Sequence, residues 1–275
     1  MTRAVTGATR VAGIIGDPVV HSRSPAMHNA AYAACGLDWV YAAFTVPAGG
    51  AADALQAARA LGMAGLNVTM PHKTDAAAAC DELTPTARRL DAANTVSLGE
   101  GGRLLGDSTD GPGFLAALAG LGVDSKGRRV LVLGAGGAGR AIANALGAVG
   151  AHVVVAARRK EAAITAAALA NGEAIELQDV DGELADVDVI VNATPLGMRG
   201  EAPPFDPSRL GVKHVVFDTV YHPTETPLMV AARARGATVT NGLSMLVHQA
   251  AVAFRVFTGV EAPLDAMRTA AEHAQ

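Results

Sequence analysis

The stretch VLVLGAGGAGRAIA, residues 130–143, gives the strongest indication of the fold. An apolar run at 130–133 leads directly into the glycine pattern G-x-G-x-x-G at 134–139, and a helical stretch follows. This order provides a tight turn, a backbone that a pyrophosphate can approach, and amide groups at a helix N-terminus that bind it. A second strand, 153–156, comes next, as a Rossmann unit requires. The stretch therefore predicts a dinucleotide bound at this loop.

The identity of that dinucleotide depends on the residues at the end of the second strand. An NAD site usually has Asp or Glu there, which binds the ribose 2′-hydroxyl. This sequence has Arg158, Arg159 and Lys160 instead. A guanidinium group can bind a 2′-phosphate through two hydrogen bonds, whereas a carboxylate would repel it. The basic run favours NADP. The alternative is that these three residues only begin a helix and are solvated there.

The composition is that of a globular protein and argues against several classes of function. Half of the 275 residues are hydrophobic, and the net charge of -4 gives no broad attraction to nucleic acid or to an anionic membrane. Two cysteines, Cys35 and Cys80, are too few for a disulfide framework and have no histidines spaced for a metal site. Because no signal peptide or membrane-spanning stretch is apparent, we expect a cytoplasmic protein.

Short β-branched runs alternate with alanine-rich helical stretches along the chain, which is typical of parallel α/β architecture. In the first half we predict helices at 25–35 and 51–61, strands at 11–15, 40–46 and 66–70, and a hairpin of 94–98 with 103–106. In the second half we predict a helix at 114–121 and a doubly wound sheet of five strands, at 130–133, 153–156, 187–191, 215–218 and 238–240. The boundary between the halves falls near residue 110.

Polar residues stand where strands of the first half end or helices begin. Asn67 and Thr69 interrupt an apolar strand, and Lys73 follows Pro71 at a place where a helix can begin. Further members of the set are Ser22, Ser24, Asn94, Asp110 and Gln249. Each alone fits a helix cap or a turn. Together they place uncharged hydrogen-bonding groups around one lysine and one aspartate, which suits a small polyhydroxylated acid better than a lipid or a nucleic acid.

These stretches also carry a resemblance to a known family. Eight motifs occur in order along nearly the whole chain: HSRSPAMHN, NVTMPHK, AANTV, STDGPGF, GAGGAGRA, NATPLGM, DTVYHPTETPL and NGLSMLVHQAAVAF. By these motifs the chain resembles the shikimate dehydrogenases. The resemblance implies reversible reduction of 3-dehydroshikimate to shikimate with NADPH, in the pathway of aromatic amino acid biosynthesis. It also implies an α/β substrate domain over 1–109, a Rossmann NADP-binding domain over 110–241, and C-terminal helices over 242–275 that return to the substrate domain.

Carried over residue by residue, the resemblance implies a set of site residues. Lys73 and Asp110 would be catalytic and flank the reacting oxygen, where the Lys73 ammonium can stabilise negative charge and donate a proton. The ring acid would be bound by Ser22, Ser24, Asn67, Thr69, Asn94, Tyr221 and Gln249. NADP would be bound by Gly134, Ala135, Gly136, Gly137, Ala138, Arg158, Arg159, Asn192, Thr194, Gly242 and Met245.

Two positions depart from the family's usual pattern. Ser108 stands where the family usually has asparagine, so a shorter side chain precedes Thr109. The end of the second strand reads Ala157-Arg158-Arg159 where Asn-Arg-Thr is usual, which keeps the arginine and adds a positive charge.

Several alternatives stay open on the sequence. A paralogue that oxidises quinate or a related ring acid, with NADP or NAD, would share most of these motifs. A non-catalytic NADP-binding module would have no need for both Lys73 and Asp110. A folate-type dehydrogenase would fit the paired serines and the tyrosine motif poorly. The sequence does not distinguish a monomer from a homodimer.

Overall fold

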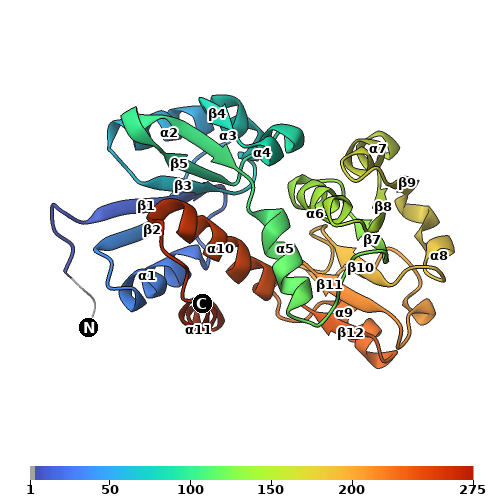
Figure 1. Ribbon diagram of the computed structural model, residues 1–275. Helices are drawn as coiled ribbons and strands as arrows, with labels where there is room; N and C mark the ends of the chain where they lie inside the picture. Colours follow the sequence, from blue (N-terminus) through green and yellow to red (C-terminus); the bar gives the residue numbers. More distant parts are fainter. Residues whose placement is uncertain (1–3, 275) are drawn as a thin grey trace. The chain divides into compact units, whose positions relative to one another are not determined.

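The computed structural model describes residues 4–274, which form two compact units. The first unit contains the chain up to Thr109 and resumes at Val247, and the second unit runs from Asp110 to Leu246. Each unit is built around its own six-stranded sheet with helices packed against it (Figure 1). The chain is therefore α/β throughout, as the alternation of strands and helices predicts.

The sheet of the first unit is mixed, with the strand order β2-β1-β3-β5-β6-β4. Its strands are β1 (Arg10–Gly16), β2 (Trp39–Thr45), β3 (Gly65–Val68), β4 (Glu82–Leu83), β5 (Thr95–Leu98) and β6 (Leu104–Asp107). β1 is parallel to β2 and to β3, whereas β5 is antiparallel to both of its neighbours, β3 and β6. Because β5 runs opposite to β3, the start of β5 lies at the same edge of the sheet as the end of β3.

Helices cover both faces of this sheet. They are α1 (Ser24–Ala34), α2 (Ala51–Ala60), α3 (Lys73–Ala79), α4 (Pro85–Leu90), the part of α10 (Leu243–Thr258) from Val247 onward, and α11 (Leu264–His273). An aliphatic core that includes Leu66 and Val96 lies between the sheet and α2 and α3. The opposite face carries a cluster of rings from α1, β2 and α10. Gly65 lets the Phe257 ring lie against β3, since a Cβ at that position would overlap it.

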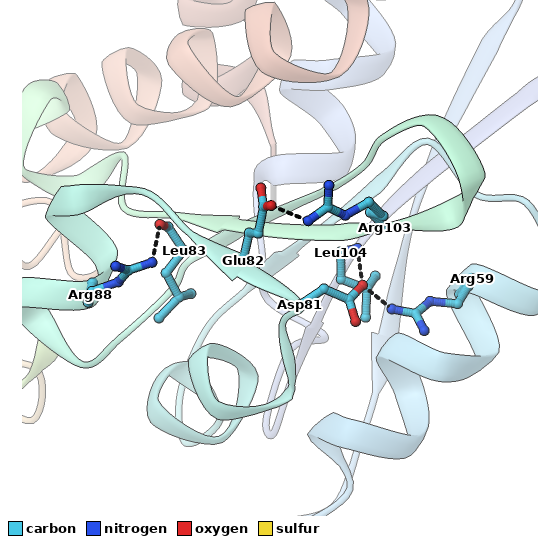
Figure 2. Close-up of polar contacts among 7 residues, drawn as sticks. All are labelled: Arg59, Asp81, Glu82, Leu83, Arg88, Arg103 and Leu104. Carbon is cyan, nitrogen blue, oxygen red and sulfur yellow. Dashed lines mark hydrogen bonds and ion pairs between the residues drawn. The ribbon is translucent and has the colours of Figure 1, made fainter.

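Charged side chains flank the two-residue strand β4, the last strand in the order of this sheet (Figure 2). Asp81 accepts a hydrogen bond from the backbone N–H of Leu104 at 2.7 Å and pairs with Arg59 of α2. That N–H and the guanidinium hold the pKa of Asp81 below its usual value. Glu82 pairs with Arg103 in the neighbouring turn. The sequence pattern gives no strand signal here; backbone hydrogen bonds from Asp81 and Thr84 to Leu104 and Gly106 join this short strand to β6, and the partly exposed charged pairs add little.

The sheet of the second unit is parallel, with the order β12-β11-β10-β7-β8-β9. Its strands are β7 (Arg129–Leu133), β8 (His152–Ala157), β9 (Glu173–Glu176), β10 (Val189–Asn192), β11 (Val215–Asp218) and β12 (Thr238–Thr240). Counted within the unit, this is the order 6-5-4-1-2-3, which defines a doubly wound Rossmann sheet. The order reverses between β7 and β10, and ligands of such sheets bind at the carboxyl ends of the strands at this point.

Helices lie on both faces of the parallel sheet (Figure 1). One face is covered by α5 (Asp110–Ala119), α6 (Gly137–Ala148) and α7 (Lys160–Ala168), and the other by α8 (Val180–Glu183) and α9 (Pro227–Ala234). Successive residues of β7 alternate between the two cores, with Val130 and Val132 in one and Leu131 and Leu133 in the other. Burial on both faces explains why this strand is apolar at every position from 130 to 133.

The structure corrects the predicted start of the first helix of the second unit. We expected it over 114–121, but α5 begins at Asp110 and ends at Ala119. The sequence Gly111-Pro112-Gly113 resembles a turn, yet it forms the first turn of the helix, where a proline loses no helical hydrogen bond. Gly111 serves close packing instead, since a Cβ there would lie 3.0 Å from the carbonyl oxygen of Ala141 on α6.

Three further predictions differ from the structure. The predicted strand 66–70 ends at Val68. The second sheet has a sixth strand, β9, which the sequence did not reveal because its residues, EAIE, are only partly apolar. The C-terminal segment joins the first unit at Val247 and not at residue 242, because Met245 belongs to the hydrophobic core of the second unit.

The buried imidazole of His28 predicts a pH dependence of stability. Burial lowers the pKa of His28 to about 3. Since its unfolded value is about 6.5, the unfolded state binds more protons between pH 6.5 and 3, and the free energy of unfolding falls as the pH drops through that window. We expect this group to cost about 2 kcal/mol at pH 5 relative to pH 7.

Urea unfolding at the two pH values measures this effect. The single tryptophan, Trp39, lies in the first unit, and its fluorescence reports unfolding of that unit. A His28→Phe variant should lose less stability between pH 7 and pH 5 than the wild type. Equal losses of stability in the two proteins would show that His28 does not cause this pH dependence.

Candidate active site

One edge of the first sheet gathers most of the predicted substrate residues. The loops that follow the parallel strands β1 and β3 contain Ser22 and Thr69, and α3 begins at Lys73. The antiparallel strand β5 begins at this same edge, directly after Asn94. Asn67 of β3 stands opposite Thr95 of β5 in the register. Sheet topology thus brings together residues that are separated in the sequence.

Asn94 connects the start of β5 to the end of the first unit. Its Oδ1 accepts the backbone N–H of Thr109 at 2.7 Å, and its Nδ2 donates to the Thr109 hydroxyl at 3.0 Å. The Thr109 hydroxyl also lies 3.4 Å from Oε1 of Gln249 on α10. All three residues belong to the first unit, and Asp110 follows Thr109 directly. Two predicted substrate residues, Asn94 and Gln249, therefore share one hydrogen-bonded network.

Hydrogen bonds of the backbone help to place the serine pair and the lysine. Ser24 is buried at the first residue of α1, and its backbone N–H donates to the Ser22 hydroxyl at 3.3 Å. Lys73 is the first residue of α3, and its carbonyl oxygen accepts the N–H of Ala93 at 2.9 Å. That bond ties the start of α3 to the segment before β5, so the backbone of Lys73 has a defined position at the polar edge.

The glycine loop of the second unit has the geometry that its pattern predicts. Gly134, which follows β7, has φ of +106°, a conformation that favours glycine. Gly139 packs against the backbone of Gly134, where a Cβ would overlap the Gly134 carbonyl oxygen. Gly136 and Gly137, at the start of α6, are exposed, and Ala135 and Ala138 flank them in the loop. The loop therefore presents open backbone at a helix N-terminus, as a diphosphate site requires.

A cavity lies beside the end of β8. It has a volume of about 340 Å³ and is lined by Arg158, Glu176, Leu177, Gln178 and Pro204. Most of these residues follow β8 and β9 at the carboxyl end of the parallel sheet. Of the two predicted arginines, Arg158 lines the cavity, whereas Arg159 precedes the first residue of α7. Arg158 therefore lines this open hollow, and contact of either arginine with a cofactor phosphate stays a prediction.

Asn192 holds the loop that follows β10. Its Nδ2 donates to Asp218 Oδ1 at 2.9 Å and to the Leu196 carbonyl at 3.0 Å, and its Oδ1 accepts from the hydroxyl and the N–H of Thr194. Asp218 also accepts from the Thr226 hydroxyl at 2.6 Å and from the Val220 N–H. Burial raises the pKa of Asp218, and the three donors oppose that shift. The resemblance implies cofactor roles for Asn192 and Thr194, whereas Asp218 has a structural role here, binding both the loop after β10 and the turn before Tyr221.

The remaining predicted residues lie around the same end of the second sheet. Tyr221 is half-buried in the loop after β11, and Gly242 packs on the backbone of Thr219 in that loop. Met245 is 7% exposed and lies in the core of the second unit. Its packing role is therefore clear, and a contact with the cofactor stays a prediction.

Other kinds of site find no support in the described part of the chain. Between residues 4 and 274, no group of three or more His, Cys, Asp or Glu side chains is placed to hold a metal ion. None of the helices in that range combines the length and apolar character needed to cross a membrane.

The fold and these contacts define a two-unit protein with a Rossmann dinucleotide-binding unit and a second α/β unit that carries a polar edge. Comparisons with known proteins identify the family. Residues 14–96 match the shikimate dehydrogenase substrate binding domain, 117–196 match the shikimate / quinate 5-dehydrogenase family, and 242–272 match the shikimate 5'-dehydrogenase C-terminal domain.

Full-length relatives agree with these matches. A shikimate dehydrogenase (NADP(+)) of Symbiobacterium thermophilum is 46% identical over 96% of this chain and 94% of its own. A crystal structure of a shikimate dehydrogenase in complex with NADP+ has a TM-score of 0.93 at 37% identity and covers 100% of this chain and 99% of its own. The Thermus thermophilus enzyme, crystallised with NADP(H) and shikimate, has a TM-score of 0.89 at 38% identity and covers 97% and 100%. The chain belongs to the shikimate dehydrogenase family.

Proposed function

We propose that this chain catalyses the reversible reduction of 3-dehydroshikimate to shikimate with NADPH. One observation carries the proposal. The second unit has a Rossmann glycine loop, and the first unit has a lysine and uncharged hydrogen-bonding groups at one end of its sheet. Relatives named as NADP-dependent shikimate dehydrogenases support this assignment over nearly the whole length. A cytoplasmic location, expected from the sequence, stays a prediction.

The substrate residues suit a hydroxylated ring acid. In the proposed complex, Ser22 and Ser24 donate hydrogen bonds to the carboxylate, with Thr69 and Tyr221 supporting that side. The ring hydroxyls are bound by Asn67, Asn94 and Gln249. These groups are uncharged, so they can bind hydroxyls without the large desolvation cost of burying unpaired charges.

The cofactor residues suit NADP. The open loop at Gly136 and Gly137 would bind the pyrophosphate through backbone N–H groups at the start of α6. Arg158, which lines the cavity beside β8, would bind the 2′-phosphate, and Arg159 adds positive charge next to it. Asn192 and Thr194 hold the loop after β10 in shape on the nicotinamide side.

Lys73 supplies the proton in the proposed reaction. NADPH supplies the hydride, which adds to the ketone carbon and leaves negative charge on the oxygen. The Lys73 ammonium stabilises that charge and donates a proton from Nζ to the oxygen, which yields the alcohol. By the resemblance, Asp110 is the second catalytic residue of the proposed reaction. In the oxidation direction the same amine accepts the proton.

The direct test uses the purified protein with shikimate or quinate and with NADP+ or NAD+. We expect kcat/KM to be highest for shikimate with NADP+, measured by absorbance of the reduced cofactor. The family description of residues 117–196 names quinate as well, so quinate is the matched competing substrate. Faster turnover of quinate would reassign the chain to that activity, and absence of turnover on both acids would reject the dehydrogenase proposal.

Lys73→Ala should lower kcat by roughly 10²–10⁴, because general acid–base catalysis commonly contributes that much. The backbone carbonyl of residue 73 still accepts the Ala93 N–H in the variant, so the start of α3 is retained. Lys126→Ala, which removes an exposed lysine from a loop of the second unit, is the control and should leave kcat unchanged. A kcat within a few-fold of wild type for Lys73→Ala would exclude this residue from proton transfer.

Arg158→Ala should raise KM for NADPH by roughly 10-fold or more, because hydrogen bonds to charged groups contribute about 1.5–3 kcal/mol each. KM for NADH, which lacks the 2′-phosphate, should change much less. Arg235→Ala removes an exposed arginine elsewhere in the second unit and controls for net charge. Equal effects of Arg158→Ala on the two cofactors would show that the arginine does not bind the phosphate.

A further inference from the structure

The side-chain amide of Asn67 is almost fully committed within the protein. Asn67 lies on β3 and is 6% exposed. Its Nδ2 donates to the carbonyl oxygen of Asn94 at 3.2 Å and to the hydroxyl of Thr95 at 3.0 Å. An asparagine amide has two donor hydrogens and an oxygen with two acceptor positions. Both donor hydrogens are therefore used, and only the oxygen can still bind a further group.

Tyr41 occupies one of the two acceptor positions. Its hydroxyl, on β2, donates to Asn67 Oδ1 at 2.7 Å. Strand β1 lies between β2 and β3, and Ala12 of β1 is the register partner of Tyr41. Ile14 of β1 is the register partner of Asn67, so the tyrosine side chain reaches Asn67 diagonally across β1. The bond thus spans two strand spacings.

Tyr41 itself is held at both ends. The side chain of Asn29 accepts the Tyr41 N–H and donates to its carbonyl oxygen, each at 2.9 Å. The Tyr41 ring stacks on His28 with a centroid distance of 4.2 Å and an interplanar angle of 3°. Tyr41 is 2% exposed, and burial raises the pKa of its hydroxyl well above the ordinary value, so it remains a donor. A side chain held in this way has little freedom to move its hydroxyl.

We propose that Tyr41 is a positioning residue that restrains the Asn67 amide, so that Asn67 can act on a bound ring acid only as an acceptor from a substrate hydroxyl. The Asn94 carbonyl excludes the flipped amide, because Oδ1 would then face another acceptor. The Tyr41 hydroxyl fixes Oδ1 and occupies one lone pair. This inference rests on the proposed function for the identity of the ligand, and it assigns to Tyr41 a role that the motif comparison did not include.

The chain offers a matched control for this residue. Tyr32 of α1 belongs to the same ring cluster, lies 6.0 Å from His28 between ring centroids, and is 1% exposed. Within residues 4–274 its hydroxyl has no hydrogen-bond partner. Tyr32→Phe and Tyr41→Phe therefore remove the same atom from the same cluster, but only the second removes a bond to Asn67.

Steady-state kinetics of the wild type and both variants test the proposal. Tyr41→Phe should raise KM for shikimate roughly 3- to 10-fold, the range that one net hydrogen bond supports, with KM for NADP+ and kcat within about twofold of wild type. Tyr32→Phe should leave all three parameters unchanged. In an Asn67→Ala background, adding Tyr41→Phe should have no further effect on KM. An unchanged KM in Tyr41→Phe, equal effects of the two tyrosine variants, or additive effects with Asn67→Ala would overturn the proposal.

A second measurement is independent of the enzymatic assignment. The side-chain NH₂ resonances of Asn67 can be identified in nitrogen-15 spectra by their loss in an Asn67→Asp variant. Tyr41→Phe should shift these resonances and speed their exchange with water, and Tyr32→Phe should do neither. Inactive wild-type protein would reject the proposed function, whereas unperturbed Asn67 resonances in Tyr41→Phe would reject the positioning role.

Discussion

The hydrogen bond from the Thr109 N–H to Asn94 Oδ1, at 2.7 Å, is the contact on which the polar edge of the first unit depends. It joins the segment that enters β5 to the last residue of this unit, directly before Asp110. Both residues are buried, so loss of the bond would leave the Thr109 N–H unsatisfied, at a cost of about 1–3 kcal/mol, although Asn94 Oδ1 would keep the Thr95 and Thr109 hydroxyls as donors. The position of Thr109, and through it the contact with Gln249, follows from this bond.

Both units use the same physical device near the end of a strand. Asn67 of β3 has both amide hydrogens donated to the protein, and Asn192 at the end of β10 has both hydrogens donated and its oxygen occupied by Thr194. A buried amide with its hydrogen bonds made has one orientation. In the first unit Asn67 Oδ1 accepts the Tyr41 hydroxyl, and binding of a ring hydroxyl at its second acceptor position is our proposal, whereas in the second unit the amide shapes a loop. The same residue type can thus bind a ligand or support a neighbour, depending on how many bonds its surroundings take.

The sequence predicted strands well where burial demands apolar or β-branched residues, as in β7, β11 and β12. The sequence pattern did not predict strands that lack such residues. β9 is polar enough to be missed, and β4 has only two residues, which backbone hydrogen bonds join to β6. Gly111 was interpreted as part of a turn, although its function is the close approach of α5 to α6. A glycine needed for packing and a glycine needed for a turn are identical in a sequence, and only the neighbouring helix distinguishes them.

The sequence by itself determined the Rossmann unit and the family, because these depend on local order: a strand, a glycine loop, a helix and eight motifs in succession. It also identified Asn67 and Asn94 as polar residues in unusual places. Only the tertiary structure decided what their amides can bind. The Tyr41 hydroxyl reaches Asn67 from a strand 26 residues away, and such contacts arise from strand order and register, which no local pattern encodes.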